Sequence, residues 1–208
     1  MVDGLLLAAG KSSRMGTPKA FLELEGEPLL IKILRSMRDG GVPHAVVVVG
    51  SETDPHLVSR ARVTEIIDAT ALTRGFDVRV VIGAPDGSPI DSIRAGLAAI
   101  DARNAVLLWP VDHPFAEGAL VRDLLSASDG ASGRIVRPIV GGHGAHPVLF
   151  GATVARELAG ATADGGAAEI VHRIPSRVVA VHATDARLTA PLNTPNEARA
   201  LGVLCAKS

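Results

Sequence analysis

Three cations and two glycines follow a short apolar run near the start of the chain. The cations are Lys11, Arg14 and Lys19, and the chain turns at Gly10 and Gly16 directly after the apolar run. Glycine lets a backbone approach a ligand closely, the amides of such a loop can point at oxygens, and Arg and Lys neutralise negative charge. The loop is therefore predicted to hold a triphosphate.

Two common phosphate-binding motifs do not describe this loop. Five residues separate Gly10 from Gly16, and Thr17 follows, so the spacing is not that of a Walker A motif. No Gly-x-Gly-x-x-Gly occurs in it, which excludes the dinucleotide fingerprint. An ordinary strand-to-helix turn with solvated Arg14 and Lys19 is the simpler alternative, but it does not explain why a cationic segment directly follows a buried strand.

A second apolar run, at residues 105–109, is followed by an acidic residue that lies between two prolines. A carboxylate fixed there, at Asp112, suits Mg²⁺, which prefers oxygen ligands and often takes only one or two from the protein. The alternative is an Asp that accepts turn hydrogen bonds or caps the next helix. For its neighbours Trp109 and His113 we expect packing and turn roles.

Alternating strand-like and helix-like segments must position these residues. We expect strands at 3–8, 45–49, 78–82, 105–109 and 177–182, and helices at 29–39, 56–68, 88–100, 116–127, 152–159, 166–173 and 195–204. Capping-box patterns with Pro at the first helical position begin two of these helices, at Ser88 and Thr194. Residues 134–150 are expected to add two short strands around a Gly/His loop, at one side of the sheet.

This alternation predicts an α/β fold with a mainly parallel sheet and helices on both faces. In such sheets ligands bind at the carboxyl ends of the strands, where residues 9–19, 83–92 and 110–115 fall. No linker, repeat or low-complexity segment interrupts the chain, so residues 1–208 are expected to form one domain.

Composition excludes several classes of protein. A net charge of −1, no block of basic residues and 2% aromatic residues argue against a nucleic-acid-binding protein. No apolar stretch reaches the length of a membrane span, and no signal peptide is visible at the start, so we expect a cytoplasmic protein without a membrane partner. A single cysteine, Cys205, provides neither an internal disulfide nor a cysteine metal site.

The first loop as a whole resembles a known signature. The pattern Leu7-Ala8-Ala9-Gly10-x-Ser12-x-Arg14-Met15-Gly16-x-x-Lys19 is similar to the loop of nucleotidyltransferases, above all to the MobA-like group that includes the molybdenum cofactor cytidylyltransferases. The resemblance extends over nearly the whole chain in five segments. It implies a three-layer Rossmann-like fold with mainly parallel strands.

The resemblance also implies roles for individual residues. Arg14, Lys19 and Asp112 would be catalytic, and Asp112 with Asn193 would hold the metal. His143 and His146 would line the acceptor side, in the segment similar to Gly-His-Pro-Val-Leu-Phe. The residues expected to bind the nucleotide are Leu7, Ala8, Ala9, Gly10, Ser12, Ser13, Arg14, Lys19 and Ser92.

Each assignment has an alternative or a departure from the pattern. Many relatives are more acidic around Asn193, and Ser92 is equally explained as part of a capped helix. The two histidines could be read as a metal pair, but no third ligand stands near them in sequence. A segment at Asp164 resembles the acceptor loop of the family and could equally start a helix.

The function implied is Mg²⁺-dependent transfer of a nucleoside monophosphate to a phosphorylated acceptor, with release of pyrophosphate. Ala9 stands where guanylyl-transferring members tend to have Gly, and a methyl group there would narrow the base pocket, so CTP is the expected nucleotide. Molybdopterin is the implied acceptor, with a molybdoenzyme or a chaperone as the implied partner. The alternatives are a sugar phosphate or other small phosphorylated acceptor, or a non-catalytic nucleotide-binding regulator or chaperone of the same fold.

Overall fold

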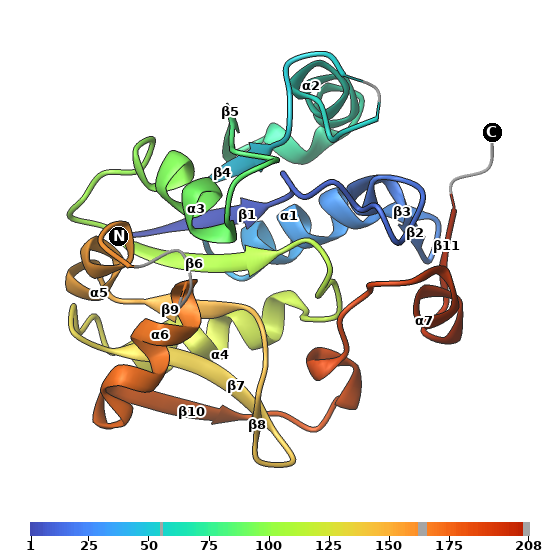
Figure 1. The fold of residues 1–208 in the computed structure, drawn as a ribbon. Coiled ribbons are helices and arrows are strands. Elements are labelled where there is room, and N and C mark those ends of the chain that lie inside the picture. The colour runs from blue at the N-terminus through green and yellow to red at the C-terminus, as the bar shows by residue number, and fades with distance from the viewer. Residues whose placement is uncertain (55, 162–165, 206–208) are drawn as a thin grey trace.

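A mixed sheet of eight strands forms the centre of the protein (Figure 1). The structure is a computed structural model that describes residues 1–54, 56–161 and 166–205. Seven strands follow the order β10-β7-β9-β6-β1-β4-β5, and β8 pairs with β7. The strands are β1 (Val2–Leu7), β4 (His44–Val49), β5 (Asp77–Ile82), β6 (Ala105–Pro110), β7 (Ile135–Val140), β8 (His143–Gly144), β9 (Val148–Phe150) and β10 (Val178–His182).

Strand β1 lies between β4 and β6 and is parallel to both. Its residues and those of its neighbours are almost all apolar, as expected for strands buried on both faces. The ladder continues beyond Leu7, because Ala8 donates to the carbonyl of Val48 and Val111 donates to the carbonyl of Leu7. The loops after β1 and β6 therefore leave the sheet side by side.

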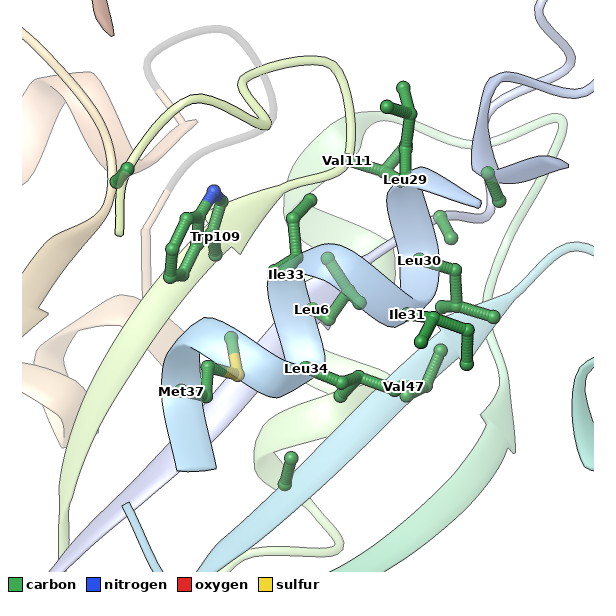
Figure 2. Packing of buried hydrophobic residues seen from close by; sticks show 14 of the residues in the cluster. Leu6, Leu29, Leu30, Ile31, Ile33, Leu34, Met37, Val47, Trp109 and Val111 are labelled. Carbon is green, nitrogen blue, oxygen red and sulfur yellow. The ribbon is translucent and has the colours of Figure 1, made fainter. Parts of the chain in front are cut away.

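Helices cover both faces and give three layers, as predicted. One face packs against α1 (Leu29–Asp39), α2 (Arg60–Asp68) and α4 (Gly118–Ser128). Figure 2 shows α1 laying its apolar side chains over Leu6, Val47 and Trp109 of the sheet. The other face packs against α3 (Pro89–Leu97), α5 (Ala152–Ala159) and α6 (Gly166–Arg173). The predicted α/β fold class is confirmed.

Both predicted capping boxes are present. At the start of α3 the backbone N–H and the hydroxyl of Ser88 donate to Asp91, at 2.9 and 2.8 Å. These hydrogen bonds lower the pKa of Asp91, and the one from the hydroxyl has the larger effect. At the start of α7 (Pro195–Ala200) Thr194 and Glu197 satisfy each other's backbone N–H groups. The sequence pattern was specific here because each cap depends only on residues three apart.

Three parts of the fold differ from the prediction. Residues 135–150 hold three strands, and β9 lies inside the sheet, antiparallel to both β6 and β7, rather than at one side. The helix predicted at 56–68 begins only at Arg60. The last helix ends at Ala200, because Gly202 takes a left-handed conformation (φ 76°) and turns the chain into β11 (Val203–Leu204).

Strand β11 completes a small second sheet that the sequence did not predict. It pairs with β2 (Glu23–Leu24), which pairs with β3 (Glu27–Pro28). Strands of two residues carry no periodic signal. This sheet brings the last described helix beside the segment that follows the first loop (Figure 1).

The remaining described elements are four short 3-10 helices: η1 (Lys19–Phe21), η2 (Ala71–Thr73), η3 (Pro175–Arg177) and η4 (Ala186–Thr189). Within the described residues, no helix is long and apolar enough to cross a membrane. The Asp164 segment lies outside the described residues, so its expected acceptor role stays a prediction.

Candidate functional site

The loop after β1 is a compact turn centred on Ser12. Ser12 has a left-handed backbone (φ 51°), and its carbonyl accepts from the backbone N–H groups of Met15 and Gly16. Its hydroxyl accepts from the backbone N–H of Lys19 at 3.2 Å. Gly16 (φ 75°) then supplies a conformation that an L side chain rarely adopts. Ser12 therefore fixes where η1 begins and where the Lys19 side chain starts.

Six consecutive backbone N–H groups of this loop have no hydrogen-bond partner among the described residues. No N–H of residues 9–14 donates a hydrogen bond to any other residue that the structure describes. A Cβ added to Gly10 would meet nothing within 4 Å. The φ of Gly10 is one that other residues also adopt, so glycine is not required by the turn here, and it leaves open space beside the loop. Backbone amides that find no protein partner require water or an anion.

The Lys19 ammonium joins two side chains from distant parts of the chain. Its Nζ donates to Oδ2 of Asp112 at 3.1 Å and to Oδ1 of Asn193 at 3.2 Å. The Lys19 side chain is 14% exposed and that of Asp112 is 26% exposed. Three residues that were predicted separately from the sequence thus meet at the carboxyl edge of β1 and β6.

Backbone contacts hold Asp112 and Asn193 in this arrangement. Leu192 donates its backbone N–H to the carbonyl of Asp112 at 3.0 Å, which ties the two segments together. The backbone N–H groups of Asn193 and Thr194 both donate to Oε2 of Glu197 at 2.9 Å. The hydrogen bond from Asn193 is the largest cause of a lowered pKa at Glu197. Asn193 is therefore placed by the helix cap that follows it.

The donor set at this point fits a hard divalent cation. One carboxylate and one amide oxygen converge on a single ammonium group, so a cation in that position is already favoured. Mg²⁺ accepts such oxygen ligands and completes its shell with water and phosphate oxygens. Among the described residues, no cluster of three or more His, Cys, Asp or Glu side chains is arranged to hold a metal. A metal bound here would share its ligands with a substrate.

The other two cations of the loop have different surroundings. Lys11 is exposed and forms an ion pair with Asp86, which follows β5, so it links the first loop to a second one. Arg14 is exposed, as is Ser13, and its charge contributes to the lowered pKa of Glu197. A small cavity of about 120 Å³ adjoins the Lys19–Asp112 pair instead, lined by Leu7, Ala8, Gly10, Ser12, Lys19, Ala20, Val58, Val111 and Asp112.

Three residues expected to bind the nucleotide are buried: Ala8, Ala9 and Ser92. Ala9 is 3% exposed, and its methyl group packs under the loop after β5, 3.1 Å from where a Cβ on Gly83 would stand. The expectation that this methyl group narrows the base pocket stays a prediction; in the structure the methyl group lies between two loops. Ser92 is 7% exposed, and its hydroxyl accepts from the backbone N–H of Ala84. Direct contact between Ser92 and a nucleotide stays a prediction.

The two histidines of the acceptor-side segment lie in different environments. His143 is exposed in β8, whereas His146 is largely buried, with its ring 4.6 Å from the ring of His113. Burial is the main cause that lowers the pKa of His146 to about 3, and the charge of Arg137 contributes. Trp109 is fully buried and donates its indole N–H to the carbonyl of His113 at 2.8 Å, so its expected packing role is confirmed.

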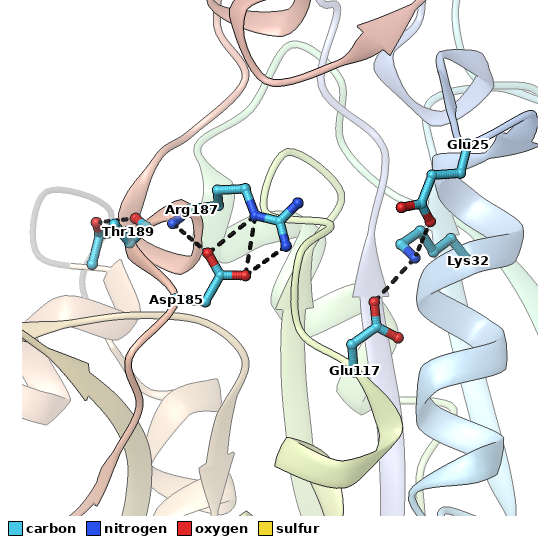
Figure 3. Close-up of polar contacts among 7 residues, drawn as sticks. Glu25, Lys32, Glu117, Asp185, Arg187 and Thr189 are labelled. Carbon is cyan, nitrogen blue, oxygen red and sulfur yellow. Dashed lines mark hydrogen bonds and ion pairs between the residues drawn. The ribbon is translucent and has the colours of Figure 1, made fainter.

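Ion pairs around the site hold its segments together (Figure 3). Lys32 of α1 binds both Glu25 in the β2–β3 turn and Glu117 at the start of α4. Burial opposes the Lys32 charge, but hydrogen bonds to the two carboxylates outweigh burial and raise its pKa. These contacts fix the β2–β3 turn against the start of α4, a few residues beyond Asp112.

A second contact holds the segment before Asn193. Arg187 is bound by Asp185, and its guanidinium lies 5.2 Å from the centre of the Phe115 ring. Because Phe115 follows Asp112 and η4 precedes Asn193, this contact places one segment against the other. The supporting roles of Lys32 and Arg187 were missed because they depend on which segments meet in space. Only the cap at Glu197 had a sequence signal.

Comparisons of the sequence with known proteins agree on one kind of protein, the nucleotidyltransferases. The sequence model of the MobA-like NTP transferase domain matches residues 4–179. The 2-C-methyl-D-erythritol 4-phosphate cytidylyltransferase of Corynebacterium efficiens is 38% identical over 112 residues, which is 51% of this chain and 42% of that protein. The molybdenum cofactor guanylyltransferase of Xanthomonas euvesicatoria is 34% identical over 126 residues, 60% of this chain and 54% of that protein. The chain thus spans about half the length of these curated relatives.

Solved structures agree with the fold. The crystal structure of Rv0371c from Mycobacterium tuberculosis superposes with a TM-score of 0.74 at 26% identity and covers 97% of each chain. A second structure of that protein is a complex with manganese; it has a TM-score of 0.70 at 22% identity and also covers 97% of each chain. Cytidylyltransferases and guanylyltransferases both occur among the relatives, and they do not single out the cytidylyl group that the sequence pattern favoured.

Proposed function

This chain belongs to the MobA-like NTP transferase domain family, and on that premise we propose that it transfers a nucleoside monophosphate from an NTP to a small phosphorylated acceptor. The observation that carries the proposal is the position of the Lys19 ammonium, shared by Asp112 and Asn193 beside the first loop. A cation, two oxygen ligands and a row of free amides at one strand edge are the groups that phosphoryl chemistry requires.

The reaction needs no covalent intermediate on the protein. An oxygen of the acceptor phosphate forms a bond to the α-phosphorus of the NTP. The bond from that phosphorus to the oxygen bridging to the β-phosphorus breaks, and pyrophosphate leaves with the electron pair. The protein contributes positioning and charge neutralisation, which supply most of the rate in such reactions.

Each residue of the site has a part in this scheme. The amides of residues 9–14 and the Arg14 guanidinium bind the β- and γ-phosphates. The Lys19 ammonium neutralises the α-phosphate as its negative charge grows, and its two oxygen partners orient it. Asp112 and Asn193 would hold a divalent cation when one is bound, in place of their hydrogen bonds to Lys19, and Mg²⁺ there would supply further neutralisation of phosphate charge. The manganese complex of the Mycobacterium tuberculosis protein supports such a site.

The nucleotide we propose is CTP. The methyl group of Ala9 packs beneath Gly83, so it sets how closely the loops after β1 and β5 approach each other. Guanylyl-transferring members of the family tend to have Gly at this position, so we base the preference for a pyrimidine on that pattern and expect the Ala9 methyl group to act through the spacing of the two loops. One methyl group changes discrimination by about 1–3 kcal/mol, or 10–200-fold.

The acceptor we propose is molybdopterin, which the family resemblance implies, with a molybdoenzyme or a chaperone as partner. A polyol or sugar phosphate is the second candidate, because the 38% identity to a 2-C-methyl-D-erythritol 4-phosphate cytidylyltransferase favours it. A nucleotide-binding regulator of the same fold would bind NTP and transfer nothing.

Pyrophosphate release tests these alternatives. We expect Mg²⁺-dependent release with CTP and either molybdopterin or 2-C-methyl-D-erythritol 4-phosphate, with kcat/KM for CTP above that for GTP. Ala9→Gly should shift the ratio toward GTP. Preference of the native protein for GTP would reject the cytidylyl proposal alone. Tight NTP binding without release for molybdopterin, 2-C-methyl-D-erythritol 4-phosphate or glucose 1-phosphate would favour the regulator.

A further inference from the structure

A second cavity, of about 290 Å³, adjoins the proposed nucleotide site. Leu7 lines both cavities, and Pro110 at the end of β6 lines the second. The cavity lies between the sheet and helices α3 and α6, and most of its lining is apolar. Its polar side chains are Arg137, His146 and His172. An apolar cavity with a few convergent polar groups is typical of a small-molecule site.

Three buried nitrogens in and beside this cavity have no hydrogen-bond partner among the described residues. Four buried side-chain nitrogens make no hydrogen bond within the described part of the chain, and three of them gather here: Nε of Arg137, Nδ1 of His146 and Nδ1 of His113, whose ring contacts His146. Arg137 makes no ion pair with any described residue, and its burial lowers the pKa of the guanidinium. The Arg137 side chain is half-buried, and a partly desolvated cation without a counter-charge favours an anionic ligand.

The neighbouring hairpin leaves room for the Arg137 side chain. A Cβ added to Gly144 in β8 would stand 1.8 Å from Cζ of Arg137. Glycine at 144 thus lets the guanidinium occupy its position beside the hairpin. His146 contributes hydrogen-bonding capacity but no charge near neutral pH, because burial lowers its pKa to about 3. Arg137 is therefore the group in this cavity that most demands an anion.

The position of Arg137 separates it from the reacting groups. Arg137 lies on β7 and Asp112 follows β6, and β9 runs between these strands. Two strand spacings are about 10 Å. The backbones that carry Arg137 and Asp112 are thus separated across the sheet, and we expect different groups of one ligand to reach them.

We propose that Arg137 binds a second anionic group of the acceptor, carried on a compact apolar body and distinct from the phosphate that reacts. This inference rests on the proposed function. It names the acceptor class as a phosphomonoester with a further phosphate or carboxylate. Molybdopterin and 2-C-methyl-D-erythritol 4-phosphate carry no such second group, so this inference favours a different small phosphorylated acceptor over both.

Two probes that differ only in that second anion test the proposal. They are 4-carboxyphenyl phosphate and phenyl phosphate, and the binding of each is measured by calorimetric titration. The binding of CTP with Mg²⁺ is measured in a separate titration. A charge-assisted hydrogen bond predicts that the native protein binds the carboxylated probe about 10-fold or more tightly than phenyl phosphate. Equal affinities, or no binding of the carboxylated probe, would overturn the proposal.

Variants locate the effect. Arg137→Gln should abolish the preference, Arg137→Lys should retain part of it, and Gly144→Ala should weaken it by displacing the guanidinium. Arg134→Gln is the matched control, because Arg134 is an exposed residue just before the same strand, and it should keep the native preference. A preference that survives Arg137→Gln contradicts the assignment.

The CTP titration keeps the two proposals apart. Unchanged CTP affinity in the Arg137 variants shows that they fold and that the nucleotide site is intact. Failure of the native protein to bind CTP would reject the proposed function. Native CTP binding without a probe preference would reject the Arg137 site alone.

Discussion

Most charged side chains at the site have a neighbour that fixes them. Lys19 is held by two oxygens, Lys11 pairs with Asp86, and the backbone of Asn193 is bound by Glu197. Arg14 differs: it makes no hydrogen bond or ion pair with any residue that the structure describes. An exposed guanidinium beside free amides keeps its donors for an incoming phosphate.

Removal of the Asp112 carboxylate should abolish turnover and leave the fold intact. Loss of one preorganised electrostatic group costs about 10²–10³-fold in rate. The side chain is 26% exposed and contacts Lys19 rather than the apolar core, so its loss should cost some stability without unfolding the protein. The measurement is kcat for Asp112→Ala with a parallel urea unfolding curve. Asp123→Ala, an exposed acid on α4, is the control. Near-native activity in a folded Asp112→Ala protein would reject the role.

Substitutions of Lys19 and Arg14 should affect different steps, the first the rate of the reaction and the second the binding of NTP. Lys19→Ala should lower kcat more than it weakens NTP binding, because charge on the α-phosphate grows toward the transition state. Arg14→Ala should chiefly raise the Kd for NTP. Arg79→Ala, on strand β5 and paired with Asp77, should change neither quantity. Normal binding and turnover in both site variants would mean that this loop does not hold the triphosphate.

Among the elements, those with local signals were predictable. Helices α1, α5 and α6 match their predicted bounds, because their apolar periodicity and end signals lie within each segment. The position of β9 was not predictable, because its order in the sheet depends on pairings with two other strands. The contact of Lys19 with Asn193 spans 174 residues of sequence, so spacing alone gives no signal for it.

Close approach of α3 to β1 depends on Gly96. A Cβ there would stand 2.2 Å from Cδ1 of Leu5 and 2.8 Å from Cγ2 of Val48. Overpacking costs about 1–3 kcal/mol. The higher helix propensity of alanine offsets at most about 1 kcal/mol of this cost. Gly96→Ala should therefore lower the free energy of unfolding, measured by urea denaturation.

The matched control for that variant is Gly160→Ala, at the end of α5. There the added Cβ meets only one atom, at 3.6 Å, and the backbone is right-handed. Its stability should change by no more than about 0.5 kcal/mol. Equal effects of the two substitutions would contradict the packing argument for Gly96.

For the molecule as a whole, stability should fall as the pH drops below about 6.5. His146 has a folded-state pKa of about 3 because it is buried, whereas an unfolded histidine titrates near 6.5. Between these values the unfolded chain binds one more proton, so each drop in pH favours unfolding. From pH 7 to pH 5 this group alone should cost about 2 kcal/mol.

Urea denaturation at the two pH values measures this effect. His146→Gln should reduce the pH dependence of the unfolding free energy, whereas His143→Gln should keep it, because His143 is exposed. His113 should add to the loss in both variants, since burial also lowers its pKa. An identical pH dependence in the native protein and His146→Gln would contradict the assignment.

The proposed reaction requires that nucleotide and metal meet at one place in the molecule. A crystal structure with a non-hydrolysable CTP analogue and Mn²⁺, located by its anomalous signal, measures this directly. The account predicts Mn²⁺ bound by the oxygens of Asp112 and Asn193, and the triphosphate on the amides of residues 9–14. Mn²⁺ bound elsewhere, or a nucleotide that leaves this loop empty, would contradict it.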